Sequence, residues 1–202
     1  MAERYREVFS ERDVDKAIIR VASDLTAAYS DPAPIQEQNP LFVQLLPGAQ
    51  PFASRLMPEI VRQVPNYHPE LDSMLIQRYA AGDIRSIAPE VTRDLSNTIN
   101  LEGRPVVLVD NLFDYGVTAE FTRAYLLGLG ARSVTLAILV QKNTPRETTI
   151  CPDFVGLHAP NQYLIGMGMD DPLIAPEFGR WWPNIVTLDT PDELPKPIPV
   201  LF

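Results

Sequence analysis

The chain has 202 residues, of which 46% are hydrophobic and 21% charged, a composition typical of a globular domain. Its formal net charge of -9 at pH 7 argues against a duplex nucleic acid partner, whose phosphates attract lysine and arginine. Its single cysteine, Cys151, excludes an intramolecular disulfide and a zinc site built from several cysteines. The start lacks the apolar core of a secretory signal, and no apolar run approaches the roughly 20 residues of a membrane helix, so we expect a cytoplasmic protein without a membrane partner.

The first half of the chain predicts helices alternating with strands. Apolar residues at helical spacing predict a helix that begins at Ser10 and lasts to about Tyr29. The apolar run at 41–46 has no helical period and predicts a buried strand. A second helix carries the apolar residues of 52–64 on one face, and 71–79 is another candidate strand.

The second half repeats this alternation after a polar, turn-rich segment at 80–104, for which we expect a loop followed by a short helix. The strand predicted at 105–109 is apolar on both faces. The remaining expected elements are a helix at 118–130 and strands at 133–140, 162–168 and 184–188.

Continuous apolar strands alternating with amphipathic helices predict an α/β fold with a mainly parallel, twisted sheet covered by helices on both faces. We expect residues 1–202 to form a single domain. Ligands of such sheets bind beyond the carboxyl ends of the strands. The topology therefore predicts a site at 110–118, directly after the strand at 105–109.

This predicted site combines features that suit a phosphorylated sugar. The amino terminus of a helix presents unpaired N–H groups to a phosphate, and Gly116 and Thr118 add a tight turn and a hydroxyl donor. Asp110 and Asn111 offer oxygen atoms to sugar hydroxyls or to Mg²⁺. A structural alternative also fits the residues, because an acid such as Asp114 before a helix commonly serves as its cap.

Four segments in order resemble the type I phosphoribosyltransferases, in particular their hypoxanthine-guanine subgroup. DNLFDYGVT (110–118) resembles the phosphoribosyl pyrophosphate motif, and PLFVQLLPGAQPFASRLMPEI (40–60) resembles the strand, turn and helix of the pyrophosphate loop. LVQKNTPRE (139–147) resembles the purine-binding lysine segment, and PDFVGLHAPNQYLIGMGMDD (152–171) resembles the carboxyl-terminal signature. The resemblance implies the family's fold, with a small hood lobe mainly from about 150–202 and part of the amino terminus.

The resemblance implies a role for each matching residue at the phosphoribosyl end of the site. Asp110 and Asn111 are expected to face the ribose hydroxyls. The backbone N–H groups of Asp114, Tyr115, Gly116, Val117 and Thr118 are expected to hold the 5′-phosphate.

At the purine end, the resemblance implies that Asp114 is the catalytic residue, an acceptor or general base at N7. Lys142 is expected to donate to the six-position oxygen. Tyr163 is expected to stack on the base, Met169 to pack on its other face, and the backbone of Leu164 to meet the two-position.

Metal and pyrophosphate are expected at the remaining matches. Asp170 and Asp110 are implied as the residues that hold Mg²⁺. Pro47, Gly48, Arg180 and Tyr79 are implied at the pyrophosphate side, Tyr79 as the aromatic residue of a mobile loop at 78–90.

Four residues depart from the family pattern. Asn111 replaces an acid, Tyr115 a threonine, Arg78 a serine, and Pro47 a lysine. The resemblance implies a cis peptide bond at this place in the pyrophosphate loop. Because an X–Pro bond adopts the cis form far more readily than other peptide bonds, we predict a cis bond between Leu46 and Pro47.

The implied activity is transfer of 5-phosphoribosyl from phosphoribosyl pyrophosphate to an oxopurine, giving a nucleoside monophosphate and pyrophosphate, in a homodimer or homotetramer. The four departures keep an alternative open. In that alternative the chain retains the fold as a catalytically weakened nucleotide-binding or regulatory protein.

Overall fold

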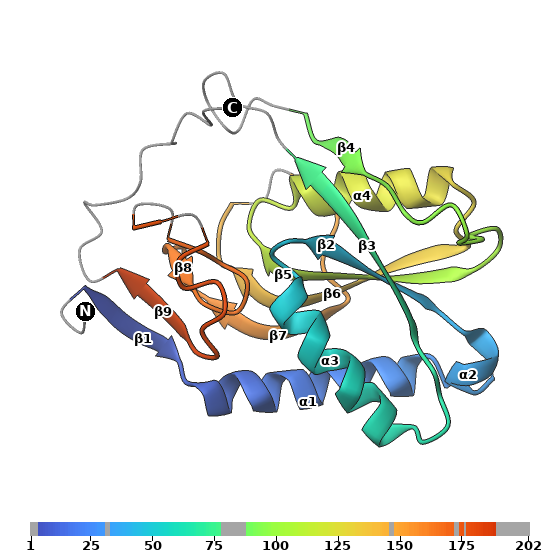
Figure 1. The fold of residues 1–202 in the computed structure, drawn as a ribbon, viewed down its shortest axis with the longest axis horizontal. Helices are drawn as coiled ribbons and strands as arrows, with labels where there is room; N and C mark the ends of the chain where they lie inside the picture. The colour runs from blue at the N-terminus through green and yellow to red at the C-terminus, as the bar shows by residue number, and fades with distance from the viewer. Residues whose placement is uncertain are drawn as a thin grey trace.

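A six-stranded sheet forms the centre of the computed structural model, which describes residues 4–30, 33–77, 88–145, 148–171, 174–175 and 177–188 (Figure 1). The strand order is β4-β3-β2-β5-β6-β7. Neighbouring strands pair in parallel except at the edge, where β4 pairs with β3 in the antiparallel sense. The strands are β2 (Leu41–Leu46), β3 (Glu70–Gln77), β4 (Glu90–Arg93), β5 (Pro105–Phe113), β6 (Ser133–Lys142) and β7 (Phe154–Ala159).

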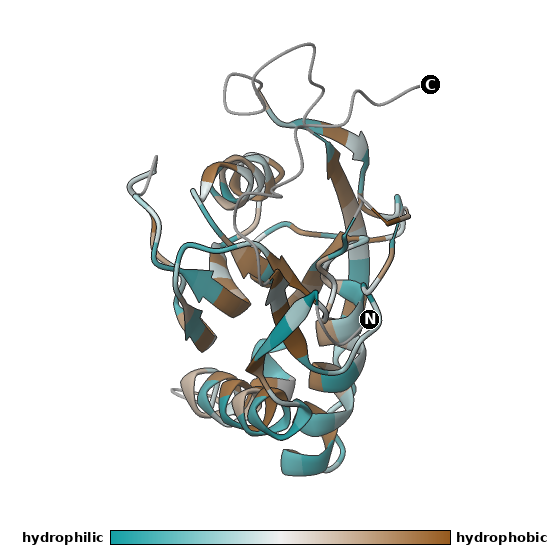
Figure 2. Cartoon of the chain, turned by 90° about the vertical axis from the view of Figure 1, so that its left-hand side faces the viewer, coloured by the Kyte–Doolittle hydropathy of each residue, from teal (hydrophilic) through white to brown (hydrophobic). Residues whose placement is uncertain are grey.

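Helices cover both faces of this sheet, as predicted. α1 (Glu11–Ala28) and α3 (Gln50–Gln63) lie on one face, and α4 (Val117–Gly128) lies on the other (Figure 1). The two layers follow from the alternation within β5, where Val107 and Val109 join one apolar cluster and Val106 and Leu108 the other. Figure 2 shows the hydrophobic strands between helices whose hydrophilic residues face outward. A one-turn helix, α2 (Ile35–Gln38), precedes β2.

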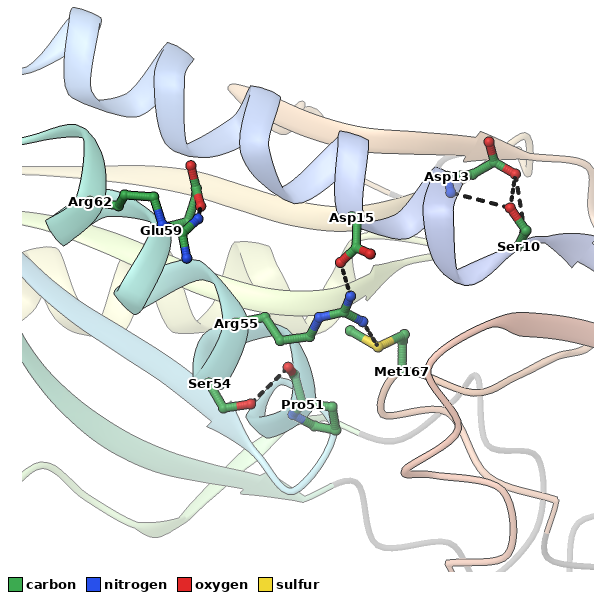
Figure 3. Close-up of polar contacts among 9 residues, drawn as sticks. All are labelled: Ser10, Asp13, Asp15, Pro51, Ser54, Arg55, Glu59, Arg62 and Met167. Atoms are coloured by element: carbon green, nitrogen blue, oxygen red, sulfur yellow. Dashed lines mark hydrogen bonds and ion pairs between the residues drawn. The ribbon is translucent and has the colours of Figure 1, made fainter.

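The first helix begins where the sequence predicts. The Ser10 hydroxyl accepts from the Asp13 N–H at 3.3 Å, and the Asp13 carboxylate accepts from the Ser10 N–H at 3.1 Å (Figure 3). This reciprocal capping box satisfies two amides at the start of α1 and fixes its first residue. None of the helices in the described ranges is long and apolar enough to cross a membrane.

A second, antiparallel sheet brings the two ends of the chain together. Its strand order is β1 (Tyr5–Phe9), β9 (Ile185–Leu188) and β8 (Leu164–Ile165), and it lies beside the start of α1 (Figure 1). Ile165, Val186 and Leu188 form its small apolar cluster. This sheet contains the residues of 164–165 and therefore positions the segment that follows them.

Two details of the predicted elements before α4 are wrong. The expected short helix within 80–104 is absent from its described part, where β4 forms instead because Val91 packs beside the core of the sheet. The strand predicted at 105–109 continues to Phe113, because Asp110, Leu112 and Phe113 remain paired with β6. By contrast, the predicted cis bond between Leu46 and Pro47 is confirmed.

Candidate active site

The loop between β5 and α4 lies at the carboxyl edge of the sheet, where the topology predicts the site. Gly116 is the residue before α4 and adopts a left-handed conformation with φ of 86°. A Cβ atom at this position would lie 2.7 Å from both Phe113 Cζ and Thr148 Oγ1, so only glycine fits. Gly116 has no side chain with which to cap α4, so a side-chain cap does not occupy the amides of its first turn.

The alternative in which Asp114 caps α4 is wrong. The Asp114 carboxylate turns away from the helix, and its Oδ2 accepts a charge-assisted hydrogen bond from Lys142 Nζ at 2.8 Å. Its Oδ1 is buried and has no hydrogen-bond partner among the described residues. The Thr144 hydroxyl donates to the Asp114 carbonyl at 2.9 Å and holds the loop against the end of β6.

This pair can address two neighbouring atoms of a heterocycle. The Lys142 ammonium donates hydrogen bonds only, and an ionised Asp114 carboxylate accepts them only. They meet because β5 and β6 are adjacent parallel strands, so their carboxyl ends reach the same edge. The structure therefore brings together the acid and the lysine that the sequence assigns to the purine.

Asp110 lies in the paired part of β5 and is partly exposed as a residue, while the surroundings of its carboxyl group are largely protein atoms. Burial raises the pKa of Asp110 to about 7, and the hydrogen bond from the Asn111 N–H, at 2.8 Å, opposes the rise only partly. No basic side chain forms an ion pair with it among the described residues. A carboxylate left in this state fits a bound cation or a ligand that donates hydrogen bonds.

We expect Asp110→Asn to stabilise the protein at pH 8 by about 1–3 kcal/mol. The folded-state pKa of about 7 exceeds the ordinary value of 3.8, so the folded form binds this proton more tightly than the unfolded form. Wild-type stability therefore falls as pH rises from about 4 to 7, and the variant escapes this loss. Urea unfolding at pH 5 and pH 8 measures the free energy of unfolding of both proteins, and Asp24→Asn at an exposed position is the control. An equal gain in stability at both pH values would contradict the raised pKa of Asp110.

On the other side of the site, Arg180 is buried against the protein. Its guanidinium donates to the Gly168 carbonyl at 2.7 Å and to Asp170 Oδ2 at 2.8 Å. The Glu177 N–H donates to the same carboxylate oxygen at 3.3 Å. Asp170 thus offers its other oxygen to a ligand, and the guanidinium expected at pyrophosphate is already engaged here.

The expected base-stacking residue has a fixed hydroxyl. Tyr163 donates its hydroxyl hydrogen to the Asp170 carbonyl at 2.9 Å, and burial raises the pKa of Tyr163 to about 12. Its ring packs beside the cluster of the second sheet. Leu164 and Met169 are buried in the main core. These contacts hold the segment at 163–170 in one arrangement.

A tight turn follows β8 where the sequence predicts a continuing strand. Gly166 and Met169 exchange backbone hydrogen bonds of 2.8 and 3.1 Å, and Gly166, Met167 and Gly168 all have positive φ. Arg55 reaches this turn by donating to Met167 Sδ at 3.4 Å, while its other nitrogen pairs with Asp15 of α1 (Figure 3). The strand predicted at 162–168 is therefore wrong beyond Ile165, although the alternating glycine and methionine residues of IGMGMD carry the signal of a turn.

The remaining predicted residues divide into three groups. Pro47 and Gly48 follow β2, and Gly48 lies close to the side chain of Asn111, which is 6% exposed. Tyr115, Val117 and Thr118 are partly exposed at the start of α4. Tyr79, together with Arg78, lies outside the described residues.

Comparison with known proteins gives one consistent result. A family model described as "Phosphoribosyl transferase domain" matches residues 10–171. The chain is 29% identical to a hypoxanthine-guanine phosphoribosyltransferase of Streptococcus pyogenes over 163 residues, covering 81% of this chain and 83% of that one. It is 30% identical to the Streptococcus agalactiae protein of the same name, with the same coverage.

Solved structures have the same fold. A hypoxanthine phosphoribosyltransferase of Staphylococcus aureus superposes with a TM-score of 0.79 at 22% identity, covering 96% of each chain. The hypoxanthine phosphoribosyltransferase of Trypanosoma cruzi gives a TM-score of 0.76 at 21% identity, covering 91% of this chain and 95% of that one.

Proposed function

This chain belongs to the phosphoribosyltransferase family and is a purine phosphoribosyltransferase, and we propose that it transfers 5-phosphoribosyl from phosphoribosyl pyrophosphate to an oxopurine. The observation that carries this proposal is the 2.8 Å pair of Asp114 and Lys142 beside the uncapped start of α4. The start of α4 suits a 5′-phosphate. The pair suits a purine whose six-position oxygen accepts a hydrogen bond.

In the proposed reaction, a ring nitrogen of the purine forms a bond to the anomeric carbon as the bond to pyrophosphate breaks. The ring loses one proton in the process. Asp114 accepts a hydrogen bond from N7 or takes this proton as a general base. Lys142 donates to the six-position oxygen and so favours oxopurines over adenine, whose amino group is itself a donor.

The donors and acceptors present fit Mg²⁺ as a cofactor. Asp110 is a carboxyl group without an ion-pair partner among the described residues, and Asp170 retains one oxygen beside its Arg180 pair. No cluster of three or more metal-binding side chains forms in the described ranges, so part of the metal's shell would come from substrate oxygens. When bound, the metal neutralises the leaving pyrophosphate.

The second sheet belongs to the proposed hood lobe of about 150–202 and the amino terminus. It positions the turn at 166–169 against the Pro47–Gly48 loop and Asn111, beside the edge where the family resemblance puts the purine ring. We place Tyr163 and Met169 on opposite faces of that ring and the Leu164 backbone at its two-position. A homodimer or homotetramer is the proposed assembly.

Nucleotide synthesis tests the proposal. Incubation with phosphoribosyl pyrophosphate, Mg²⁺ and hypoxanthine, guanine or xanthine should yield the nucleoside monophosphate with at least one of these bases. Adenine is the matched negative control. Binding of a nucleoside monophosphate without turnover of any base would favour the catalytically weakened binding protein, and absence of both would contradict both functions.

A further inference from the structure

Three segments distant in the sequence meet at the side chain of Asn111. They are the end of β5, the Pro47–Gly48 loop after β2, and the turn at 166–169. A Cβ atom added to Gly48 would lie 2.6 Å from Asn111 Oδ1, and one added to Gly168 would lie 2.7 Å from Asn111 Nδ2. The amide of Asn111 therefore fills the space between two glycine backbones.

The two glycine backbones also contact each other directly. The Cβ of an alanine at 168 would lie 1.8 Å from the Gly48 carbonyl oxygen, closer than any non-bonded contact allows. Asn111 is 6% exposed, so this contact zone excludes solvent on the side of β5. Close packing of this kind makes the position of each segment depend on the other two.

The chemistry of an amide suits this place. Asparagine has a donor and an acceptor but no charge, so burial costs far less than for the isosteric aspartate. A carboxylate here would be a second buried acid directly after Asp110 and would lie near the Gly48 carbonyl oxygen. The departure from the family's usual acid thus matches the surroundings of residue 111 in this chain.

We infer that Asn111 is a positioning residue that fixes the Pro47–Gly48 loop against the turn before Asp170 and does not itself bind the ribose. The turn is held at two further points, by Arg180 at the Gly168 carbonyl and by Arg55 at Met167. Asn111 supplies the third, which faces the loop. The inference rests on the proposed function for the identity of the ligand, because the Pro47–Gly48 loop is the proposed pyrophosphate site.

A double-mutant cycle tests the contact without any substrate. Gly48→Ala should lower Tm by at least about 5 °C, because its Cβ meets the Asn111 amide. In the Asn111→Ala background the same substitution should cost much less, because the obstructing amide is gone. Gly128→Ala, where a Cβ meets nothing within 4 Å, is the matched control and should show no such coupling. Additive losses from Gly48→Ala and Asn111→Ala would overturn the inference.

Ligand binding separates positioning from direct contact with ribose. Asn111→Asp and Asn111→Ala should weaken binding of pyrophosphate with Mg²⁺ about tenfold or more, while the affinity for inosine monophosphate, which has ribose but no pyrophosphate, should change less than about threefold. Weaker binding of inosine monophosphate with unchanged pyrophosphate binding would assign Asn111 to the ribose and overturn the inference. Equal weakening of both ligands would overturn it as well, because the expected loss is confined to the pyrophosphate loop. A wild-type protein that binds neither ligand and turns over no base would contradict the proposed function, while the thermal cycle would still decide the contact.

Discussion

Asp114→Asn is expected to lower kcat by about 10²–10⁴-fold while changing the KM for the purine only a few-fold. Asparagine has nearly the same shape and can still accept a hydrogen bond from Lys142 through its carbonyl oxygen. It cannot hold a proton as a carboxylate does, and it carries no negative charge to stabilise the ring as its proton leaves. The loss should therefore fall on the chemical step rather than on binding.

Steady-state kinetics with the preferred oxopurine measure this prediction. Asp94→Asn is a suitable control, because Asp94 is an exposed acid that pairs with Tyr125 away from the α4 amino terminus. Its kcat should stay close to the wild-type value. Equal losses of affinity and turnover in Asp114→Asn would contradict this role, and a raised KM with unchanged kcat would assign Asp114 to base binding alone.

The part of the fold that depends on continuous local pattern was predictable from sequence. β5 and β6 are apolar on both faces, which only a covered parallel sheet requires, and α1 has both an apolar stripe and a capping box. β1, β4 and β7 were not predicted. Each is a short strand with mostly polar or partly exposed residues, and its conformation depends on pairing with β9, β3 or β6 rather than on its own pattern.

The candidate site likewise has a part that the sequence predicts and a part that it does not. Asp114 and Lys142 were predictable because parallel neighbouring strands end at one edge, so two positions in the sequence fix one place in space. The burial of Asn111 was not predictable, since it depends on glycine backbones from two other segments. The engagement of Arg180 with Asp170 likewise joins two segments ten residues apart in the chain, so it depends on how the connection between β8 and β9 folds back on itself.

We expect Gly168→Ala to destabilise the protein by at least about 3 kcal/mol and to abolish most of its turnover. Two costs add at this position. Gly168 has φ of 101°, which an alanine adopts only with strain. Its new Cβ would also lie 1.8 Å from the Gly48 carbonyl oxygen, a backbone atom that cannot rotate away. The proposed pyrophosphate loop and the turn before Asp170 would have to separate, which should raise the KM for phosphoribosyl pyrophosphate in any folded fraction.

Two further glycines separate these costs in urea unfolding. Gly103 has φ of 67° and nothing within 4 Å of an added Cβ, so Gly103→Ala reports backbone strain alone, about 1 kcal/mol. Gly128 lies in α4 with equally open space, so Gly128→Ala should be neutral or slightly stabilising. The excess of Gly168→Ala over Gly103→Ala then measures the close approach of the two backbones. If the two substitutions cost the same, the backbones do not meet, and the coupling through Asn111 loses its physical basis.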